Sequence, residues 1–389
     1  MDFLAFLEGI LLGIFSGLVP GVHPNTIGAL LPQILGGENL AIILIGTLGA
    51  YTAVSFLPSI FLGIPEGDTV ISLLPGQRLL KEGRAREAVF VVGASLCAAA
   101  IISAAAVFVF GRELAGIFPL IKPYTGYILV LFSALLLFRE SKFRRIIFAG
   151  LVFFLSGILG FVALNSQMKD PLFPLFAGFF AIPALLMHRD FVSGKKEIGE
   201  NNYSTSFLPY VAIGVVLGAI ADFLPGISTP SQLAVFGSLA DKNISARNFL
   251  AQIAAIEASH SIFSISSASF VGIARVGAVA ISSNAYEFGP WDMPIFLGVF
   301  LACLGVGAIF ILRFGWVFEK VLSKIKFEPV AKILCLYLVV LAFLFEGWYG
   351  VLALFVAALI GFLPIMWGVS RTHVMGSIIL VSILGAFFG

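Results

Sequence analysis

The sequence predicts an all-α polytopic membrane protein made of two inverted-topology repeats, each with a re-entrant Pro-Gly hairpin and about five transmembrane helices. The first observation is composition: 60% of the 389 residues are hydrophobic and only 11% are charged, whereas soluble domains average about 25% charged residues. The second is that a Pro-Gly step interrupts an apolar segment in each half, at Pro20-Gly21 and Pro225-Gly226, and the third is the one-sided placement of lysine and arginine. The composition excludes a soluble globular protein, and the net charge of +2 gives no sign of a nucleic-acid partner.

Long apolar segments fill both halves of the chain, which are separated by one polar stretch, residues 188–206. These segments are too long for the short alternating strands of an outer-membrane barrel. The expected organisation is an N-terminal repeat over 1–187, a linker over 188–206 and a C-terminal repeat over 207–389. The apolar segments lie near 3–20, 25–36, 40–64, 87–110, 124–138, 144–165 and 172–187, and then near 207–225, 230–240, 247–273, 293–312, 329–345, 349–366 and 373–388.

Lysine and arginine predict the orientation, because they favour the cytoplasmic side of short loops. Of the 23 such residues, 19 fall between the apolar segments in places that can all face the cytoplasm. This requires that 3–36 and 207–240 form hairpins that enter the membrane without crossing it. Each repeat then crosses about five times, in opposite senses, so both termini are expected outside and the linker in the cytoplasm. A second internal similarity supports the repeat, because "FLGIPEGDTVIS" (61–72) resembles "FVGIARVGAVAIS" (270–282).

Two apolar segments are interrupted by Pro-Gly steps, Pro20-Gly21 and Pro225-Gly226, which lie 205 residues apart. Proline lacks an N–H and glycine permits a turn, so each step is expected to end a helix. An unpaired backbone group in hydrocarbon costs several kcal/mol, so such breaks must line a cavity or pack against protein. A second helix is expected to begin near Pro24, because proline suits the first turn of a helix.

Each new helix presents free N–H groups and about half a positive charge at its start, which suits a carboxylate or phosphate group. Two hairpins entering from opposite sides would bring their tips together near the midplane, so we predict an anion-binding centre there. The alternative is a pair of kinks that serve only packing. The substrate-binding residues expected at the tips are His23, Asn25, Thr26, Ser228, Thr229 and Ser231.

Four further polar residues in or beside the apolar segments are candidates. Glu257 and His260 lie three residues apart, hence on one helical face, and a carboxylate at membrane depth usually faces a cavity or a partner. We expect Glu257 and Asp222 to bind the coupling ion and His260 to bind substrate. The alternative for Glu257 and His260 is a polar contact between helices, and the alternative for Asp222 is a structural helix cap. Arg275 is expected to pair with a substrate carboxylate, or else to extend to the membrane interface. His23 is as well suited to capping a helix as to the site.

At these residues the sequence resembles the TctA family, the large membrane subunit of tripartite tricarboxylate transporters, including its stand-alone archaeal-type relatives. The G-x-x-x-G-x-x-P-G pattern over 13–21 is similar to that family, as is "IPEGDTVISLLPGQRLLKEGRAREA" from Ile64. In the second half, Pro225-Gly226 and Glu257 of "IEASHS" are similar to a further break and a P-E-x-x-N-N-A-like segment. The resemblance implies a transporter that commonly works with an extracytoplasmic binding protein and a small membrane subunit. The sequence departs from the family pattern at Pro75, at Ser259-His260 and over 23–25.

The predicted function is secondary active transport of a small organic anion, a carboxylate, coupled to Na⁺ or H⁺ by alternating access around the two hairpin tips. The alternative is a translocase of polyprenyl-phosphate, because a lipid-linked phosphate would use the same anion site. An enzyme is not expected, since the sequence has no His-Glu-x-x-His and no Gly-x-Ser-x-Gly, whereas a channel stays open as a third class. No cofactor or metal site is expected, with Na⁺ entering only as a coupling ion, because Cys97, Cys303 and Cys335 lie singly. The expected partners are the anion, membrane lipid and an extracytoplasmic binding protein, and a homo-oligomer is compatible with the sequence.

Overall fold

The fold is helical throughout the part of the chain that the computed structural model describes, and no β-strand occurs in that part. This confirms the all-α class that the sequence predicts. The structure describes residues 2–19, 22–31, 35–62, 73–140, 142–169, 171–187, 202–223, 244–322 and 327–388.

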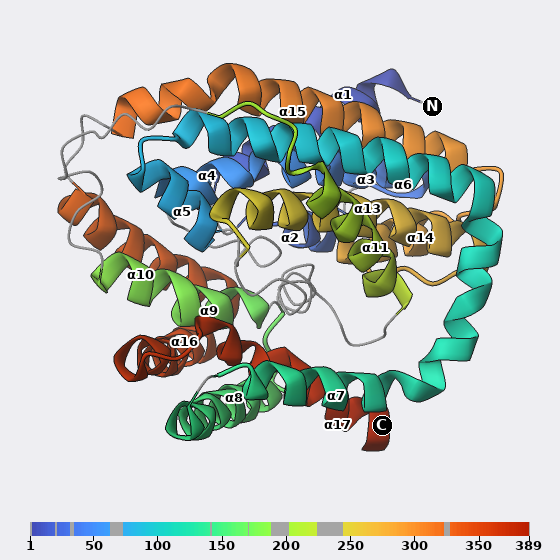
Figure 1. Cartoon of the computed structure of the whole chain (residues 1–389). Coiled ribbons are helices and arrows are strands. Elements are labelled where there is room, and N and C mark those ends of the chain that lie inside the picture. Colours follow the sequence, from blue (N-terminus) through green and yellow to red (C-terminus); the bar gives the residue numbers. More distant parts are fainter. Residues whose placement is uncertain are drawn as a thin grey trace.

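The helices follow the apolar segments of the sequence and are coloured in chain order in Figure 1. Those before residue 188 are α1 (Phe3–Leu18), α2 (Pro24–Leu30), α3 (Gly37–Val54), α4 (Phe56–Leu62), α5 (Leu73–Lys81), α6 (Ala85–Ile121), η3 (Lys122–Tyr124), α7 (Thr125–Phe138), α8 (Phe143–Leu164), α9 (Leu172–Phe176), η4 (Ala177–Ala181) and α10 (Ile182–Met187). Those after residue 201 are α11 (Leu208–Phe223), α13 (Ala246–Val271), α14 (Gly277–Ala285), α15 (Met293–Leu322), α16 (Phe327–Trp367), η5 (Arg371–Met375) and α17 (Gly376–Phe388).

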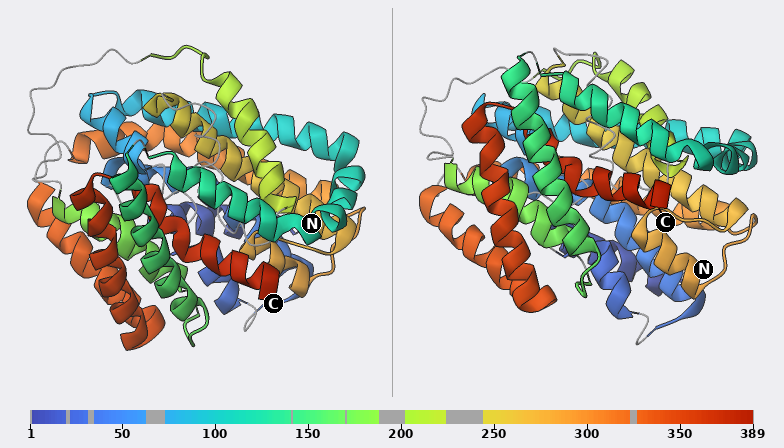
Figure 2. Two further views of the ribbon diagram at one scale, coloured as in Figure 1. Left: turned by 60° about the horizontal axis from the view of Figure 1, so that its bottom comes forward. Right: turned by 90° about the horizontal axis from the view of Figure 1, so that it is seen from below.

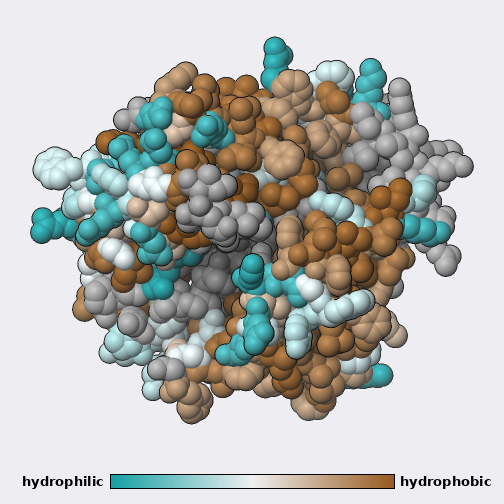
Figure 3. All heavy atoms as spheres, turned by 180° about the vertical axis from the view of Figure 1, so that it is seen from behind, coloured by the Kyte–Doolittle hydropathy of each residue, from teal (hydrophilic) through white to brown (hydrophobic). Residues whose placement is uncertain are grey.

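Membrane-length helices and exposed apolar side chains show that this is a multi-pass membrane protein. Large apolar residues such as Phe154 on α8 and Trp348 on α16 are 55% and 76% exposed, and apolar side chains cover much of the face in Figure 3. Apolar surface of this extent is typical of helices that face lipid. The orientation of the termini stays a prediction. Among the described residues, six segments are long and apolar enough to cross a membrane: Gly37–Leu62, Ala85–Glu113, Phe143–Leu164, Met293–Phe318, Ala331–Trp367 and Arg371–Phe388.

The helices gather into two groups that do not coincide with the two halves of the sequence (Figures 1 and 2). The central group contains α1 to α6, α11 and α13 to α15; in it, α3 packs against α1 and α15, and α13 packs against α6 and α11. The peripheral group contains α7 to α10, α16 and α17; in it, α8 packs against both α16 and α17. The chain passes between the groups where α6 runs through η3 into α7. Each group therefore combines helices from both halves.

Several helices of the first half match helices of the second half in length and order. α1 and α11 each have 16 residues, and α5 and α14 each have 9. Between them, the combined segment of α3 and α4 has 26 residues, as does α13. A repeated architecture requires this kind of correspondence.

A buried charge network joins the two halves within the central group. Glu87 on α6 is fully buried and accepts hydrogen bonds from the Arg84 guanidinium at 2.6 and 2.9 Å and from the backbone N–H of Asn202 at 2.7 Å. Its Oε1 atom also lies 3.1 Å from Nε of Arg247 on α13, and Arg247 donates a hydrogen bond to Ser206 Oγ at 2.7 Å. The hydrogen bond to Glu87 raises the pKa of Arg84. Because removing one partner would leave a buried charge uncompensated, the network fixes α6 against α13.

Glycine allows close packing and one kink in the peripheral group. A Cβ atom at Gly160 on α8 would lie 1.8 Å from the backbone oxygen of Ser377 on α17, so only glycine lets these helices approach so closely. The segments predicted at 329–345 and 349–366 lie on either side of a break at Gly347, so the element labelled α16 consists of two helices joined at that residue. Gly347 has φ 63° and ψ −151°, a conformation that glycine adopts far more readily than other residues.

Candidate functional site

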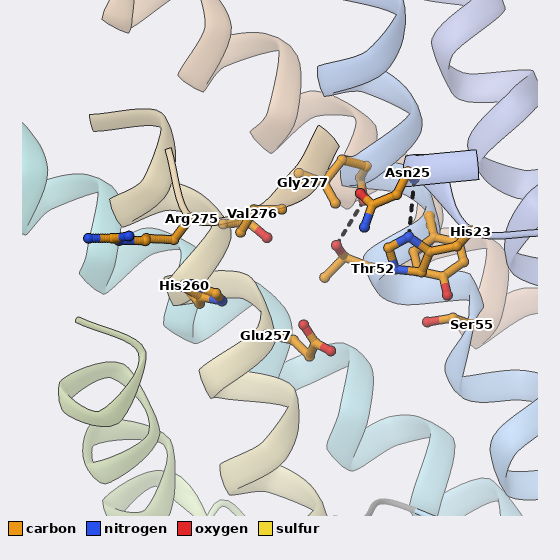
Figure 4. Close-up of a pocket in the computed structure, with 12 residues that line it drawn as sticks. His23, Asn25, Thr52, Ser55, Glu257, His260, Arg275, Val276 and Gly277 are labelled. Carbon is orange, nitrogen blue, oxygen red and sulfur yellow. Dashed lines mark hydrogen bonds between the residues drawn. The ribbon is translucent and has the colours of Figure 1, made fainter. Parts of the chain in front are cut away.

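A polar chamber lies in the central group, between the start of α2, the C-terminal half of α3, the middle of α13 and residues 275–277 (Figure 4). Its walls come from both halves of the sequence, because α2 and α3 precede the linker and α13 and α14 follow it. The cavity has a volume of about 40 Å³. The residues that line it are His23, Asn25, Leu48, Tyr51, Thr52, Ser55, Glu257, His260, Ser261, Arg275, Val276 and Gly277.

The first wall begins where the chain breaks between α1 and α2. α1 ends at Leu18 and α2 begins at Pro24, as the Pro-Gly step predicts. His23 is the N-cap of α2, because its Nδ1 atom accepts a hydrogen bond of 3.1 Å from the backbone N–H of Asn25. The His23 ring also meets the edge of Tyr51, with ring centroids 5.0 Å apart. His23 therefore caps the helix and lines the chamber at the same time.

Asn25 enters the chamber from the first turn of α2 and lies against α14. A Cβ atom at Gly277 would come within 2.6 Å of Asn25 Oδ1, so glycine at this position leaves room for the amide. The Oδ1 atom of Asn25 and the hydroxyl of Ser55 are buried and have no hydrogen-bond partner among the described residues. Buried polar atoms are nearly always hydrogen-bonded. These two oxygens therefore indicate that the chamber holds a water, an ion or a ligand.

The second wall is formed by α3 and its C-cap, Ser55. Tyr51, Thr52 and Ser55 are all buried. The Thr52 hydroxyl donates a hydrogen bond of 2.8 Å to the backbone oxygen of Leu48, which leaves its lone pairs able to accept another. Figure 4 shows Thr52 beside Asn25 and Ser55 beside His23.

The third wall is the polar face of α13. Glu257 and His260 lie on one face of this helix, as their spacing predicts, and are only 6% and 2% exposed. Figure 4 shows both side chains directed into the chamber, and Ser261 lines it beside them. Among the residues placed by the structure, no group of three or more His, Cys, Asp or Glu side chains could hold a metal ion. A carboxylate at membrane depth is costly unless a cavity, partner or ion compensates for it.

Arg275 borders the chamber, but its guanidinium points away from Asn25, Thr52 and Glu257 (Figure 4). Its backbone N–H donates a hydrogen bond of 2.8 Å to the hydroxyl of Ser264 on α13. Asp222, in the last turn of α11, is 2% exposed and accepts a hydrogen bond from Ser267 on α13, and it is not among the residues that line the chamber.

Five of the residues predicted to bind substrate or coupling ion line this chamber: His23, Asn25, Glu257, His260 and Arg275. Thr26 belongs to α2, one position after Asn25. The roles of the other predicted residues stay predictions, because Pro20, Gly21, Pro225, Gly226, Ser228, Thr229 and Ser231 lie outside the described residues.

Sequence reasoning missed Tyr51 and Thr52, although a signal for them exists. The repeated F-x-G-I motif starts at residues 61 and 270, a spacing of 209. The same spacing carried upstream pairs Tyr51 with His260 and Thr52 with Ser261. All four residues line the chamber, so corresponding turns of α3 and α13 supply two of its walls.

Membrane-length apolar helices around a polar chamber define a polytopic membrane transport protein. Comparison with known proteins identifies the family: residues 3–376 match the tripartite tricarboxylate transporter TctA family. The chain belongs to this family, whose members are transporter components and not enzymes. An uncharacterized protein of Methanocaldococcus jannaschii is similar, with 29% identity over 287 residues that cover 71% of each chain. No solved structure gives a significant match.

Proposed function

We propose that this protein is a secondary transporter of a small organic carboxylate, coupled to Na⁺ or H⁺, and that the chamber binds both substrate and cation. The observation that carries the proposal is the chamber itself, in which buried donors and a carboxylate from both halves of the chain face one cavity. Polar groups at membrane depth mark substrate and ion pathways. The family match adds tricarboxylates as the first substrates to test.

The anion site consists of neutral donors together with Arg275. Asn25, Thr52 and Ser261 offer amide and hydroxyl groups, and His260 offers a ring N–H. Ser228, Thr229 and Ser231 belong to the same site in this proposal, with His23 and Thr26 on the other side. Seven of the twelve residues that line the chamber are buried and the other five are half-buried, which favours a water-soluble anion over a lipid-linked phosphate.

Charge balance favours cation coupling. If both histidines are neutral and the three other groups are ionised, Asp222, Glu257 and Arg275 carry a net charge of −1. At an effective dielectric constant of 20, two like charges 4 Å apart repel by about 4 kcal/mol, so a carboxylate cannot enter unless a cation arrives with it. Asn25 Oδ1 and Ser55 Oγ are oxygens without a described hydrogen-bond partner, and with Glu257 they could coordinate Na⁺. A cavity of about 40 Å³ suits a small cation or a few waters.

The small cavity also requires a conformational change during transport. Pockets for organic ligands measure about 300–1,000 Å³, so a tricarboxylate needs the chamber to widen. In our proposal this happens by alternating access around the two hairpin tips that the sequence predicts at Pro20-Gly21 and Pro225-Gly226. The matched lengths of α1 and α11, and of α3–α4 and α13, support the inverted repeat on which this mechanism depends.

Partners and topology complete the proposal. The family is named as tripartite, so we propose that an extracytoplasmic binding protein delivers the anion and that a small membrane subunit accompanies this chain. The placement of lysine and arginine supports cytoplasmic exposure of residues 188–206. Both termini then lie outside.

The test is uptake of radiolabelled citrate and succinate into proteoliposomes under Na⁺ and proton gradients. Gradient-driven uptake is expected for the wild type, and Glu257→Gln is expected to lower it by about tenfold or more, which corresponds to 1.4 kcal/mol. Glu113→Gln is the matched control, because Glu113 is an exposed carboxylate on α6. Absence of gradient-driven uptake for every carboxylate tested would contradict the proposal, as would full activity of Glu257→Gln.

A further inference from the structure

A groove on the exposed surface of the central group lies between α6 and α15, which pack side by side (Figure 1). A Cβ atom at Gly93 on α6 would lie 3.2 Å from Leu312, and one at Gly315 on α15 would lie 3.2 Å from Val89, so the two helices run antiparallel. The groove has a volume of about 460 Å³. None of the described residues that line it also lines the chamber.

The side walls of the groove are apolar. Val89, Ile311 and Leu312 line it, and Leu312 is 47% exposed, so the groove is open to its surroundings. Phe61 also lines it, and its buried ring stacks on Phe318 with ring centroids 5.9 Å apart. In a bilayer these walls meet hydrocarbon that is as apolar as they are, so they accept an acyl chain without selecting a lipid. Selectivity must come from the polar end of the groove.

One end of the groove carries aromatic and basic side chains. Trp316 and Tyr203 line it and are 48% and 52% exposed, and both residue types favour the membrane–water interface. Arg86 lines the groove from the first turn of α6 and is exposed. On α15, Arg313, Trp316 and Lys320 follow at intervals of three and four residues, hence on one helical face. The ammonium group of Lys320 lies 5.9 Å from the centre of the Trp316 ring.

This end of the groove has an excess of positive charge. Residues 81–90 and 311–320 together contain five basic and three acidic residues. Two of the acidic residues, Glu82 and Glu87, each form ion pairs with two arginines. The placement of lysine and arginine predicts that this end faces the cytoplasm, where anionic lipids give the membrane a negative surface potential that attracts basic residues.

We infer that the groove binds an anionic phospholipid, with one acyl chain between α6 and α15 and the phosphate group against Arg86, Arg313 and Lys320. The volume of about 460 Å³ lies within the range of about 300–1,000 Å³ that small-molecule sites occupy. The basic end matches the charge of the headgroup, and the apolar walls match the chain. The inference does not depend on the proposed function, because it uses no residue of the chamber.

The bound lipid contacts both halves of the chain and the segment that joins them. α6 belongs to the first half and α15 to the second, and Tyr203 lies near the end of residues 188–206. The Tyr203 ring meets the edge of Phe90 at a centroid distance of 5.2 Å, and the backbone N–H of Asn202 donates to Glu87. A lipid that binds only the folded protein stabilises it by mass action, so the lipid is expected to stabilise this junction.

Quenching of Trp316 fluorescence by brominated phospholipids tests the site. The variant Trp291→Phe/Trp348→Phe/Trp367→Phe keeps Trp316 as the sole tryptophan. Purified full-length protein in detergent is titrated with brominated phosphatidylglycerol or brominated phosphatidylcholine. Half-maximal quenching is expected at a concentration about 5-fold lower, or less, for the anionic lipid. Equal quenching curves for the two lipids would overturn the inference.

A second sole-tryptophan variant controls for lipid that coats the protein without selectivity. Trp291→Phe/Trp316→Phe/Trp367→Phe keeps Trp348, which is 76% exposed on α16, and it is expected to be quenched equally by both lipids. The same preference for phosphatidylglycerol at Trp348 as at Trp316 would contradict a site between α6 and α15.

Removal of one charge tests the headgroup contact. Arg86→Gln is expected to raise the half-maximal concentration of phosphatidylglycerol about 5-fold and to leave that of phosphatidylcholine unchanged. Arg112→Gln is the matched control, because Arg112 is an exposed arginine near the other end of α6. Equal effects of the two substitutions would contradict the contact.

The unfolding midpoint gives a readout that needs no tryptophan substitution. The midpoint of the wild type is expected to rise more with phosphatidylglycerol than with phosphatidylcholine, and Arg86→Gln is expected to reduce this difference. A wild-type midpoint that rises equally with both lipids would overturn the inference, whether or not the protein transports a carboxylate.

Discussion

Replacing Gly277 with alanine perturbs the chamber at its closest contact. The new Cβ atom would lie 2.6 Å from Oδ1 of Asn25 and 2.7 Å from both Cγ and Nδ2. Favourable contacts between carbon atoms begin at about 3.5 Å. The amide of Asn25 must therefore move by about 1 Å, or α14 must move away from α2.

The expected effect is on binding rather than on folding. Overpacking of this kind costs about 1–3 kcal/mol, and the obstructed atoms are the movable end of a side chain. We therefore expect the fold to survive and Asn25 to leave its position in the chamber. Since 1.4 kcal/mol is a factor of ten in a binding constant, citrate binding is expected to weaken by about 5- to 150-fold.

The assay is the KM of citrate uptake in proteoliposomes, together with the yield of monodisperse protein as a measure of folding. Gly298→Ala on α15 is the matched control, because a Cβ atom there would have nothing within 4 Å. An unchanged KM in Gly277→Ala would refute the reasoning. The double variant Asn25→Ala/Gly277→Ala separates the two roles of Asn25: uptake stays low if the amide is a ligand, and recovers if the amide only packs.

Two further predictions concern stability and are measured as the unfolding midpoint of the purified protein. Gly160→Ala places a Cβ atom 1.8 Å from the backbone oxygen of Ser377, so α8 and α17 must separate and stability is expected to fall by about 3 kcal/mol. The control is Gly150→Ala on α8, where a Cβ atom meets nothing within 4 Å, and this variant is expected to be neutral or stabilising. Equal unfolding midpoints for the two variants would contradict the close packing of α8 on α17. Glu87→Gln removes a fully buried carboxylate from its arginine partners and is expected to destabilise by about 3–5 kcal/mol. Glu82→Gln affects two partly exposed ion pairs, with Arg78 and Arg84, so its cost is expected to stay below about 1 kcal/mol. A larger loss than for Glu87→Gln would count against the buried network.

Features with a local cause could be predicted from the sequence. The break between α1 and α2 follows from proline and glycine chemistry, and the start of α2 at Pro24 follows from the preference of proline for the first helical turn. The cap by His23 is one of the two roles that the sequence leaves open for that residue. The shared face of Glu257 and His260 follows from helical periodicity alone. The family itself could be identified from its motifs, and the match over residues 3–376 confirms it.

Features that depend on tertiary packing could not be predicted in this way. Tyr51 and Thr52 lie in a helix whose other residues are mostly apolar, so the pattern of that helix gives them no site role, and only the repeat spacing that pairs them with His260 and Ser261 points to the chamber they line. The direction of the Arg275 side chain, away from Asn25, Thr52 and Glu257, is a choice between rotamers that a sequence pattern does not determine. The combination of α7 and α8 with α16 and α17 in one group requires contacts between distant parts of the chain.

Among the residues that the structure describes, the chamber takes its walls from both sides of residues 188–206 and none from the peripheral group. A chain divided within residues 188–201 would thus give two polypeptides, one with His23, Asn25 and Thr52 and the other with Glu257 and His260. Neither fragment could recreate the binding pocket alone. Co-expression of the two fragments would therefore serve as a reconstitution assay. Restored carboxylate uptake would show that the fragment with α3 and the fragment with α13 had assembled in the bilayer.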